Sequence, residues 1–191
     1  MTGFHSSRRW RVGSLAMVAA AALSMSVASD AQTPPPAQGT IALEGTMKTF
    51  YKGVNVIVVA TLDGVEHTYH FAKDLVVHGG KGPQGLEGLK EGTMVVLHYS
   101  GTGSEASARE IDRIGEDDGL KITEGRVVRV DRGRKAITIK FDDGKTETFR
   151  LTDRAASEGK RNEEAASGTR VVIYYADEAG QRVAHYFKTA P

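Results

Sequence analysis

Hydrophobic and polar residues alternate along most of the sequence after residue 40, which is the period-two pattern of strands with one buried face. In the segment 136–141, Ile137 and Ile139 share one face, and Thr138 and Lys140 share the other. The same pattern predicts strands at 56–61, 65–71, 94–100, 108–114, 136–141, 146–151, 170–176 and 184–188. With the segments that begin at Glu44 and Glu124, each half of the chain holds five strands.

Turn signals separate these strands. Asp63-Gly64 and Asp143-Gly144 are Asp-Gly steps between alternating segments, which is typical of tight hairpin turns. Alanine-rich 153–166 is expected to hold a short helix. The segment 74–91 is rich in glycine and is expected to be a loop.

The two halves of the sequence resemble each other. Residues 44–47 align with 124–127 at an offset of 80, and 92–99 align with 168–175 at an offset of 76. The difference of four falls in a glycine-rich loop, where length changes cost little free energy. This agreement of several landmarks in order predicts an internal duplication.

These patterns predict an all-β protein with two tandem five-stranded small β-barrels, either OB-like or SH3-like. Barrel closure removes exposed strand edges. The first barrel is placed at 40–114, an acidic linker at 115–119 and the second barrel at 120–191. Each barrel has only about 70 residues and no disulfide, so we expect the two to pack together or to be unusually well filled.

The N-terminal segment has the pattern of a secretory signal peptide. Arg8, Arg9 and Arg11 precede an apolar stretch at 15–27, and small residues end at Ala31. We expect cleavage after residue 31, a proline-rich spacer at 32–39 and no transmembrane segment in the mature chain. An uncleaved anchor is the alternative, and export by the general or the twin-arginine route is left open.

A family resemblance rests on short motifs of the second half. Residues 125–127, the strand 137–139, the Asp143-Gly144 turn and the Gly168-Thr169 step before a strand resemble small secreted bacterial β-barrel domains of unknown function. Those domains are similar in kind to OB-fold or SH3-like barrels. The resemblance implies a small barrel fold and a secreted, periplasmic location, and it supplies no catalytic residues.

Composition excludes several chemistries. The chain has no cysteine, which rules out disulfides, thiolate metal sites and cysteine nucleophiles. Ser157 and Lys160 match the S-x-x-K pattern of serine acyl enzymes, but its companion motifs are missing. A calcium loop centred on Gly119 fails because Ile114 and Gly125 would stand at ligand positions. We therefore expect no enzyme and no cofactor.

Histidine offers the alternative hypothesis of a copper, nickel or zinc site. Four of the five histidines after residue 31 lie in the first half, namely His67, His70, His78 and His98. His67 and His70 are three apart on a strand and face opposite sides. The sequence therefore predicts a half-buried His67, exposed histidines elsewhere and no assigned metal ligands.

Charge differs between the halves. Residues 40–114 hold 7 Lys and Arg against 9 Asp and Glu, whereas residues 120–191 hold 15 against 11. Basic residues cluster around the first turn of the second half, at Arg126, Arg129, Arg132, Arg134 and Lys135. Export argues against nucleic acid as the partner. We predict a non-catalytic binding or structural module for an envelope protein or an anionic polymer, contacted at the inter-barrel groove and the segment 76–90, with periplasmic metal binding as the alternative.

Overall fold

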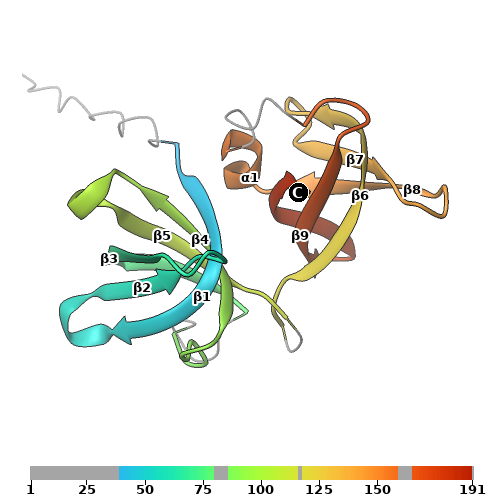
Figure 1. Cartoon of the computed structure of the whole chain (residues 1–191). Coiled ribbons are helices and arrows are strands. Elements are labelled where there is room, and N and C mark those ends of the chain that lie inside the picture. The colour runs from blue at the N-terminus through green and yellow to red at the C-terminus, as the bar shows by residue number, and fades with distance from the viewer. Residues whose placement is uncertain (1–38, 80–85, 116–117, 159–164, 191) are drawn as a thin grey trace, which may run out of the picture. The chain divides into compact units, whose positions relative to one another are not determined.

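The computed structural model describes residues 39–79, 86–115, 118–158 and 165–190. These residues form two five-stranded sheets, each closed into a barrel (Figure 1), which confirms the all-β prediction. The predicted signal peptide at 1–31 and all of the spacer except Gly39 lie outside the described residues, as do residues 116–117 of the linker.

The first barrel has the strand order β1-β2-β3-β5-β4. Its strands are β1 (Ile41–Tyr51), β2 (Val56–Ala60), β3 (Glu66–His78), β4 (Met94–Ser100) and β5 (Ser107–Arg113). Short 3-10 turns follow β1 and β4, as η1 (Lys52–Val54) and η2 (Gly103–Glu105).

The second barrel has the matching order, β6-β7-β8-β10-β9, around its closed sheet. Its strands are β6 (Lys121–Asp131), β7 (Ala136–Lys140), β8 (Thr146–Leu151), β9 (Arg170–Glu178) and β10 (Gln181–Thr189). The helix α1 (Asp153–Glu158) follows β8. It occupies the start of the predicted helix, and residues 159–164 are outside the described part.

The connections in both barrels are of the OB-like kind among the two expected types. In each barrel one parallel pair closes an otherwise antiparallel sheet, β3 with β5 in the first and β8 with β10 in the second. Such a Greek-key barrel leaves no free strand edge. No helix in the described ranges has the length and hydropathy to cross a membrane. The duplication itself stays a prediction from the sequence.

Both predicted Asp-Gly hairpin turns are present. Gly64 and Gly144 have φ of 83° and 87°, in the left-handed region that glycine adopts without steric cost. Asp143 Oδ1 accepts a hydrogen bond from the Lys145 backbone N–H at 2.9 Å, which closes the second turn.

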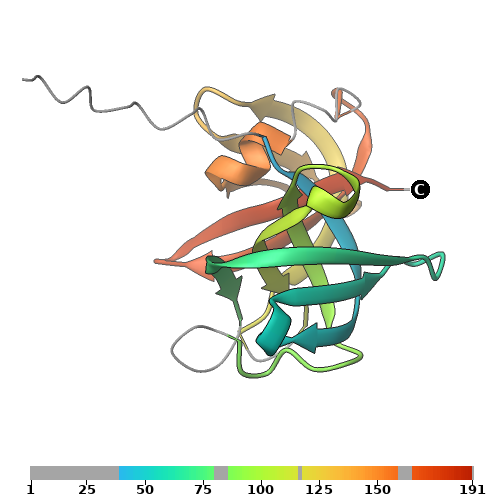
Figure 2. The ribbon, with the colours of Figure 1, turned by 90° about the vertical axis from the view of Figure 1, so that its left-hand side faces the viewer.

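The loop predicted at 74–91 is wrong at its start. β3 continues as a strand through His78, and Figure 2 shows it as one long arrow. The reason is tertiary, because Val76 and His78 pair in parallel with Glu110 and Asp112 of β5. A local pattern does not reveal such a partner, because parallel pairing joins segments far apart in the chain.

Each barrel has its own apolar core, and a third cluster joins the two. Inward-facing residues such as Ile57 and Ile111 fill the first barrel, and Ile137 and Phe149 fill the second. The third cluster contains Val96, Leu120, Val172 and Tyr174. It therefore combines residues of β4 and β9, and the expectation that the barrels pack together is confirmed.

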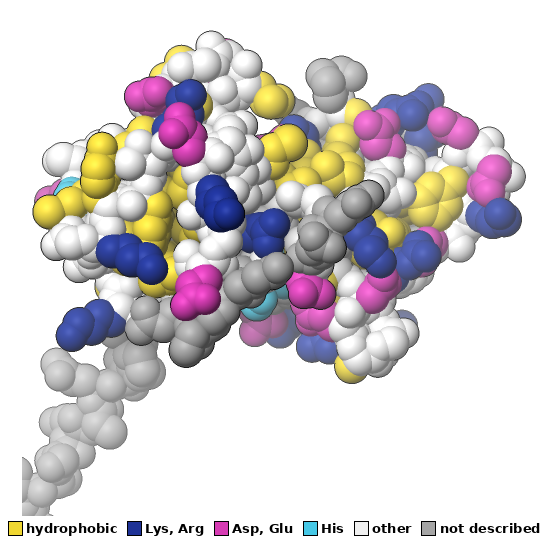
Figure 3. Space-filling model, turned by 90° about the horizontal axis from the view of Figure 1, so that it is seen from below, with side chains coloured by type: hydrophobic (Ala, Val, Ile, Leu, Met, Phe, Trp, Pro, Cys, Tyr) yellow, Lys and Arg dark blue, Asp and Glu magenta, His cyan; other side chains and the backbone are white. Residues whose placement is uncertain are grey.

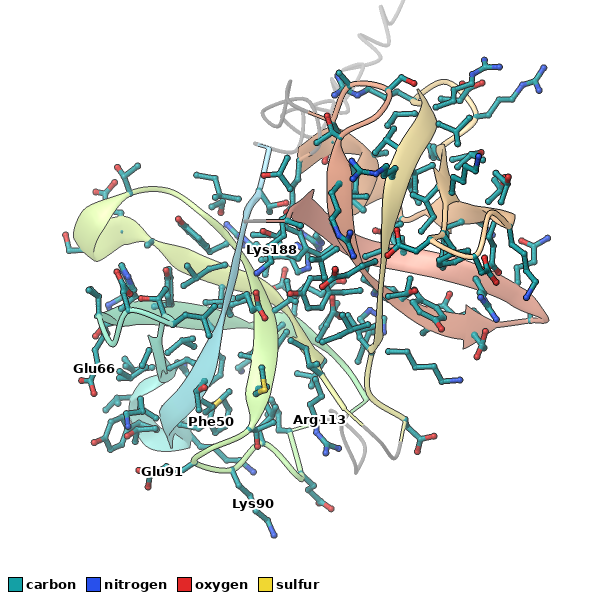
Figure 4. All side chains as sticks on the ribbon, turned by 45° about the vertical axis from the view of Figure 1, so that its right-hand side comes forward. Phe50, Glu66, Lys90, Glu91, Arg113 and Lys188 are labelled. Carbon is teal, nitrogen blue, oxygen red and sulfur yellow. The ribbon has the colours of Figure 1, made fainter. Side chains whose placement is uncertain are left out.

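The packed faces come from the same strands of each barrel. Val96 on β4 and Val172 on β9 are equivalent at the offset of 76, and both are buried in the third cluster. Next to this cluster, Lys188 of β10, which is labelled in Figure 4, forms an ion pair with Glu44 of β1. The remaining polar residues of this interface form the candidate site.

Candidate metal centre

Four side chains with metal-binding atoms come together beside this interface. They are His78 at the end of β3, Glu110 and Asp112 on β5, and His185 on β10. One ligand atom from each residue lies within 4.8 Å of the other three. The first barrel therefore supplies three of the groups and the second barrel supplies the fourth.

The parallel pairing of β3 with β5 positions the first three groups. Alternation along β5 directs Glu110 and Asp112 to the same outer face of the barrel, on either side of the inward-facing Ile111. His78 is the register partner of Asp112. The extension of β3 that the sequence did not predict therefore brings the histidine beside the acids.

A β-bulge positions the fourth group. The pairing of β10 with β9 shifts register between Ala184 and Tyr186, so His185 is the extra residue. A bulge interrupts the alternation of side chains along a strand and re-aims the extra residue. His185 is 2% exposed and reaches the carboxylates of β5.

The spacing of the four groups suits a small cation. Asp112 Oδ1 lies 3.4 Å from His185 Nδ1, and Glu110 Oε1 lies 3.5 Å from His78 Nε2 and 3.8 Å from His185 Nδ1. Ligands about 2.0–2.1 Å from a tetrahedral zinc ion are about 3.3 Å from one another. These three separations are thus close to those of a tetrahedral site, none of them is a hydrogen bond, and the other pairs of ligand atoms lie within 4.8 Å.

Two of the atoms that face the centre are buried without a hydrogen-bond partner among the described residues. They are Asp112 Oδ1 and His185 Nδ1. Asp112 has no exposed surface, so bulk water cannot hydrogen-bond to this oxygen. The two atoms are within ion-pair distance of each other, but neither is held by a hydrogen bond, and buried polar atoms without one are rare enough to require an explanation.

The outer atoms of three of these groups are held by other side chains. Glu110 Oε2 accepts from Arg154 Nε at 2.6 Å, and Asp112 Oδ2 lies 3.1 Å from His98 Nε2. His185 Nε2 lies 2.7 Å from Glu178 Oε1. Each of these contacts leaves the other polar atom of the group directed to the centre, which is the usual arrangement around protein-bound metals.

His98 is a fully buried link behind Asp112. Its Nδ1 lies 2.9 Å from Glu158 Oε1, which also accepts a hydrogen bond of 2.5 Å from Thr40 Oγ1. Burial opposes a charge on His98, but the hydrogen bonds with Asp112 and Glu158 outweigh it and raise the pKa of His98 to about 9. The prediction of exposed histidines is therefore wrong for His98.

The same balance of burial against ion pairing sets the charges on His185 and Asp112. Burial disfavours charge on His185, yet its contacts with Asp112 and Glu110 raise its pKa to about 10. For Asp112, burial raises the pKa, but the nearby imidazoles of His185 and His98 lower it well below the usual value. At neutral pH, His98 and His185 are thus imidazolium groups, and together with Arg154 they balance the three buried carboxylates of Glu110, Asp112 and Glu158.

A cavity connects the centre with the surface. His78, Glu178 and His185 lie on its wall, together with Leu120 and Lys121 at the start of the second barrel, and its volume is about 770 Å³. The side chain of His78 is 43% exposed, so one of the four groups is open to solvent. A hydrated ion therefore has an entry path.

The structure separates the four histidines of the alternative hypothesis. His67 and His70 lie farther back on β3, where His70 is exposed and His67 stacks 6.4 Å from Tyr69. His78 belongs to the centre, and His98 lies behind it.

The sequence did not point to Glu110, Asp112 or His185 as site residues. The sequence did contain one signal for the site. Glu110 and Asp112 lie two positions apart on a predicted strand, so they share one face of it.

The comparisons with known proteins give no family. No protein family matches the sequence, and no curated protein matches it. Among solved structures, a chain described as "Crystal structure of Ag(I)CusF" matches with 11% identity and a TM-score of 0.31. The match covers 39% of this chain and 97% of that chain. At this identity and score, the likeness carries no argument about function.

Proposed function

We propose that this protein binds a divalent metal ion such as zinc at the centre formed by His78, Glu110, Asp112 and His185. One observation carries the proposal. The buried atoms Asp112 Oδ1 and His185 Nδ1 are 3.4 Å apart, make no hydrogen bond among the described residues and face two further ligand atoms.

The donor set favours a particular class of metal. Two imidazoles and two carboxylates suit zinc, copper(II) or nickel(II), whereas soft monovalent ions prefer sulfur ligands. The chain has no cysteine. Met47 is buried in the first core, and Met94 is not among the ligand groups. The proposed cargo is therefore a divalent ion.

Four protein ligands leave no coordination position for a substrate in a tetrahedral site. Catalytic zinc sites keep such a position, and structural or carrier sites do not. The proposed role is therefore binding rather than catalysis, which keeps the expectation that the protein is not an enzyme. The N-terminal sequence pattern supports the further proposal that it acts in the bacterial periplasm.

Metal titration of the full chain tests the proposal. Zinc, nickel and copper(II) are added to the metal-free protein against a chromophoric chelator, and thermal unfolding is followed in parallel. A ligand that binds only the folded state adds about 2.7 kcal/mol at 100 times its dissociation constant. We expect saturable binding of one ion per chain and a rise in the midpoint of unfolding.

Matched histidine variants locate the ion. His78→Gln and His185→Gln remove proposed ligands, and each should weaken binding at least about tenfold. His70→Gln is the control, because His70 is exposed on the same strand as His78 and outside the centre. Absence of saturable binding, or equal losses for His70→Gln and His78→Gln, would overturn the proposal.

The interaction module predicted from the sequence is a second proposal. Its support is the basic cluster of the second half, but the structure pairs part of that cluster with acids: Arg129 with Asp131 at 2.7 Å and Lys135 with Asp153 at 2.5 Å. On the face shown in Figure 3, positive and negative side chains are interspersed. Retention of the protein on an anionic polymer at physiological salt would support this role. Absence of retention even at low salt, where charge attraction is strongest, would contradict it.

A further inference from the structure

Both carboxylates of the centre are held from the same helix of the second barrel. Arg154 donates directly to Glu110 Oε2 at 2.6 Å. Glu158 contacts His98 Nδ1 at 2.9 Å, and His98 Nε2 contacts Asp112 Oδ2. Neither Arg154 nor Glu158 is among the four ligand groups.

The two helix residues act from one face. Arg154 and Glu158 are four positions apart on α1, so their side chains lie above one another on the helix surface. Asp153 and Ser157 are exposed on the same helix. α1 therefore presents one polar face to the first barrel and another to solvent.

We infer that α1 is the positioning element of the metal centre, and that it sets the metal affinity of carboxylates that belong to the other barrel. The inference rests on the proposed function. A carboxylate held by one oxygen cannot rotate freely, so its second oxygen is already directed to the centre before the ion arrives. Fixing ligands in advance removes part of the ordering cost of binding.

The electrostatic effect of α1 is twofold. Arg154 neutralises part of the charge on Glu110, and Glu158 completes the hydrogen bonding of His98, so that His98 holds Asp112 in one orientation. Loss of an outer partner of this kind typically reduces metal affinity 10- to 100-fold. The effect should appear although the four ligands are unchanged.

The test uses the full chain with substitutions on α1. Arg154→Met and Glu158→Gln remove the two contacts, and Arg154→Lys retains the positive charge. Asp153→Asn and Ser157→Ala are matched controls on the same helix, away from the centre. We expect a 10- to 100-fold weaker zinc affinity for Arg154→Met and Glu158→Gln, partial recovery for Arg154→Lys and wild-type affinity for both controls.

Two further measurements separate positioning from folding. Thermal unfolding of each metal-free variant reports whether it is folded at the titration temperature. The visible spectrum of bound cobalt(II) reports the coordination geometry, and it should change for Arg154→Met and Glu158→Gln only. A purely structural role of α1 would lower the unfolding midpoint and leave both the affinity of the folded protein and the cobalt spectrum unchanged, which would overturn the inference.

The outcomes also separate this inference from the proposed function. If wild-type protein binds no ion, the proposed function fails. If the wild type binds, the ligand variants lose binding and the α1 variants keep wild-type affinity, the centre stands and the inference about α1 fails.

Discussion

Gly45 and Gly125 occupy equivalent positions in the two barrels, but a side chain at each would meet different neighbours. A Cβ atom on Gly45 would lie 2.5 Å from the backbone oxygen of Ala60. On Gly125, 80 positions later, the Cβ would lie 2.8 Å from Ile139 Cδ1 and 3.0 Å from the backbone oxygen of Lys140. The end of a side chain can move aside, whereas a carbonyl in a paired strand cannot, and the carbonyl contact is the shorter one at Gly45.

We predict that Gly45→Ala destabilises the protein by about 1–3 kcal/mol, the usual cost of overpacking, and that Gly125→Ala costs less. Gly53→Ala is the control, because a Cβ there meets nothing within 4 Å. Urea unfolding of the three variants measures the differences. Equal losses at Gly45 and Gly125 would contradict the assignment of the backbone contact as the decisive one.

The site residues show why the sequence revealed the barrels more readily than the centre. Alternation identifies which residues face the inside of a barrel, and it correctly predicts the strands around Ile137 and Ile111. It assigns every outward residue to solvent. Glu110 and Asp112 are outward residues that a second barrel covers, and no local pattern encodes that cover.

At the scale of elements, the β9–β10 hairpin positions His185. Its two-residue turn consists of Ala179 and Gly180, with φ of 48° and 77°. Both residues are therefore left-handed, as in the hairpin turns that favour Asn-Gly. The left-handed conformation has a higher steric cost for alanine than for asparagine.

We predict that Ala179→Asn stabilises the protein by up to about 1 kcal/mol, because it relieves the left-handed alanine. Thermal unfolding should show a higher midpoint. The control is Ala166→Asn, at an exposed alanine that is not left-handed, which should bring no gain. A lower unfolding midpoint for Ala179→Asn would contradict the idea that the left-handed alanine destabilises the turn.

The elements that the sequence predicted least well are those with non-local causes. The strand β3 was expected to end before residue 74, and it continues because β5 lies beside it. The bulge at His185 shifts the pairing of β10 with β9, and the sequence analysis did not predict it. The hairpins around Gly64 and Gly144 were predicted well, because their determinants lie within four residues.

At the scale of the whole molecule, tyrosines of the second barrel contribute to the interface. The rings of Tyr174 and Tyr186 lie 5.4 Å apart. Burial, with the nearby charges of Glu44 and Glu158, raises the pKa of Tyr186 to about 12. Burial and a hydrogen bond with Glu44 also raise the pKa of Tyr174. Both phenols therefore stay neutral in the folded protein well above pH 10.

This difference makes stability depend on alkaline pH. An unfolded tyrosine ionises near pH 10. Between pH 10 and 12, the unfolded chain loses a proton that the folded protein keeps, so the free energy of unfolding falls by up to about 1.4 kcal/mol per pH unit for this group. Below pH 10 the contribution of Tyr186 is constant.

We predict that Tyr186→Phe loses less stability than the wild type between pH 10 and 12, because the ionisable group is gone. Urea unfolding at pH 7, 10 and 11.5 measures the two slopes. Tyr174→Phe should act in the same direction. Parallel pH profiles for the wild type and Tyr186→Phe would contradict the assignment of a shielded phenol.

The division of the centre between the barrels has a consequence for how copies of the chain can associate. A short linker joins the barrels, and an exchange of second halves between two chains at this linker would be a domain swap. Each exchanged pair would still unite His78, Glu110 and Asp112 of one copy with His185 of the other. A chain defective at His78 and another defective at His185 could then form one intact centre between them, although neither has one alone.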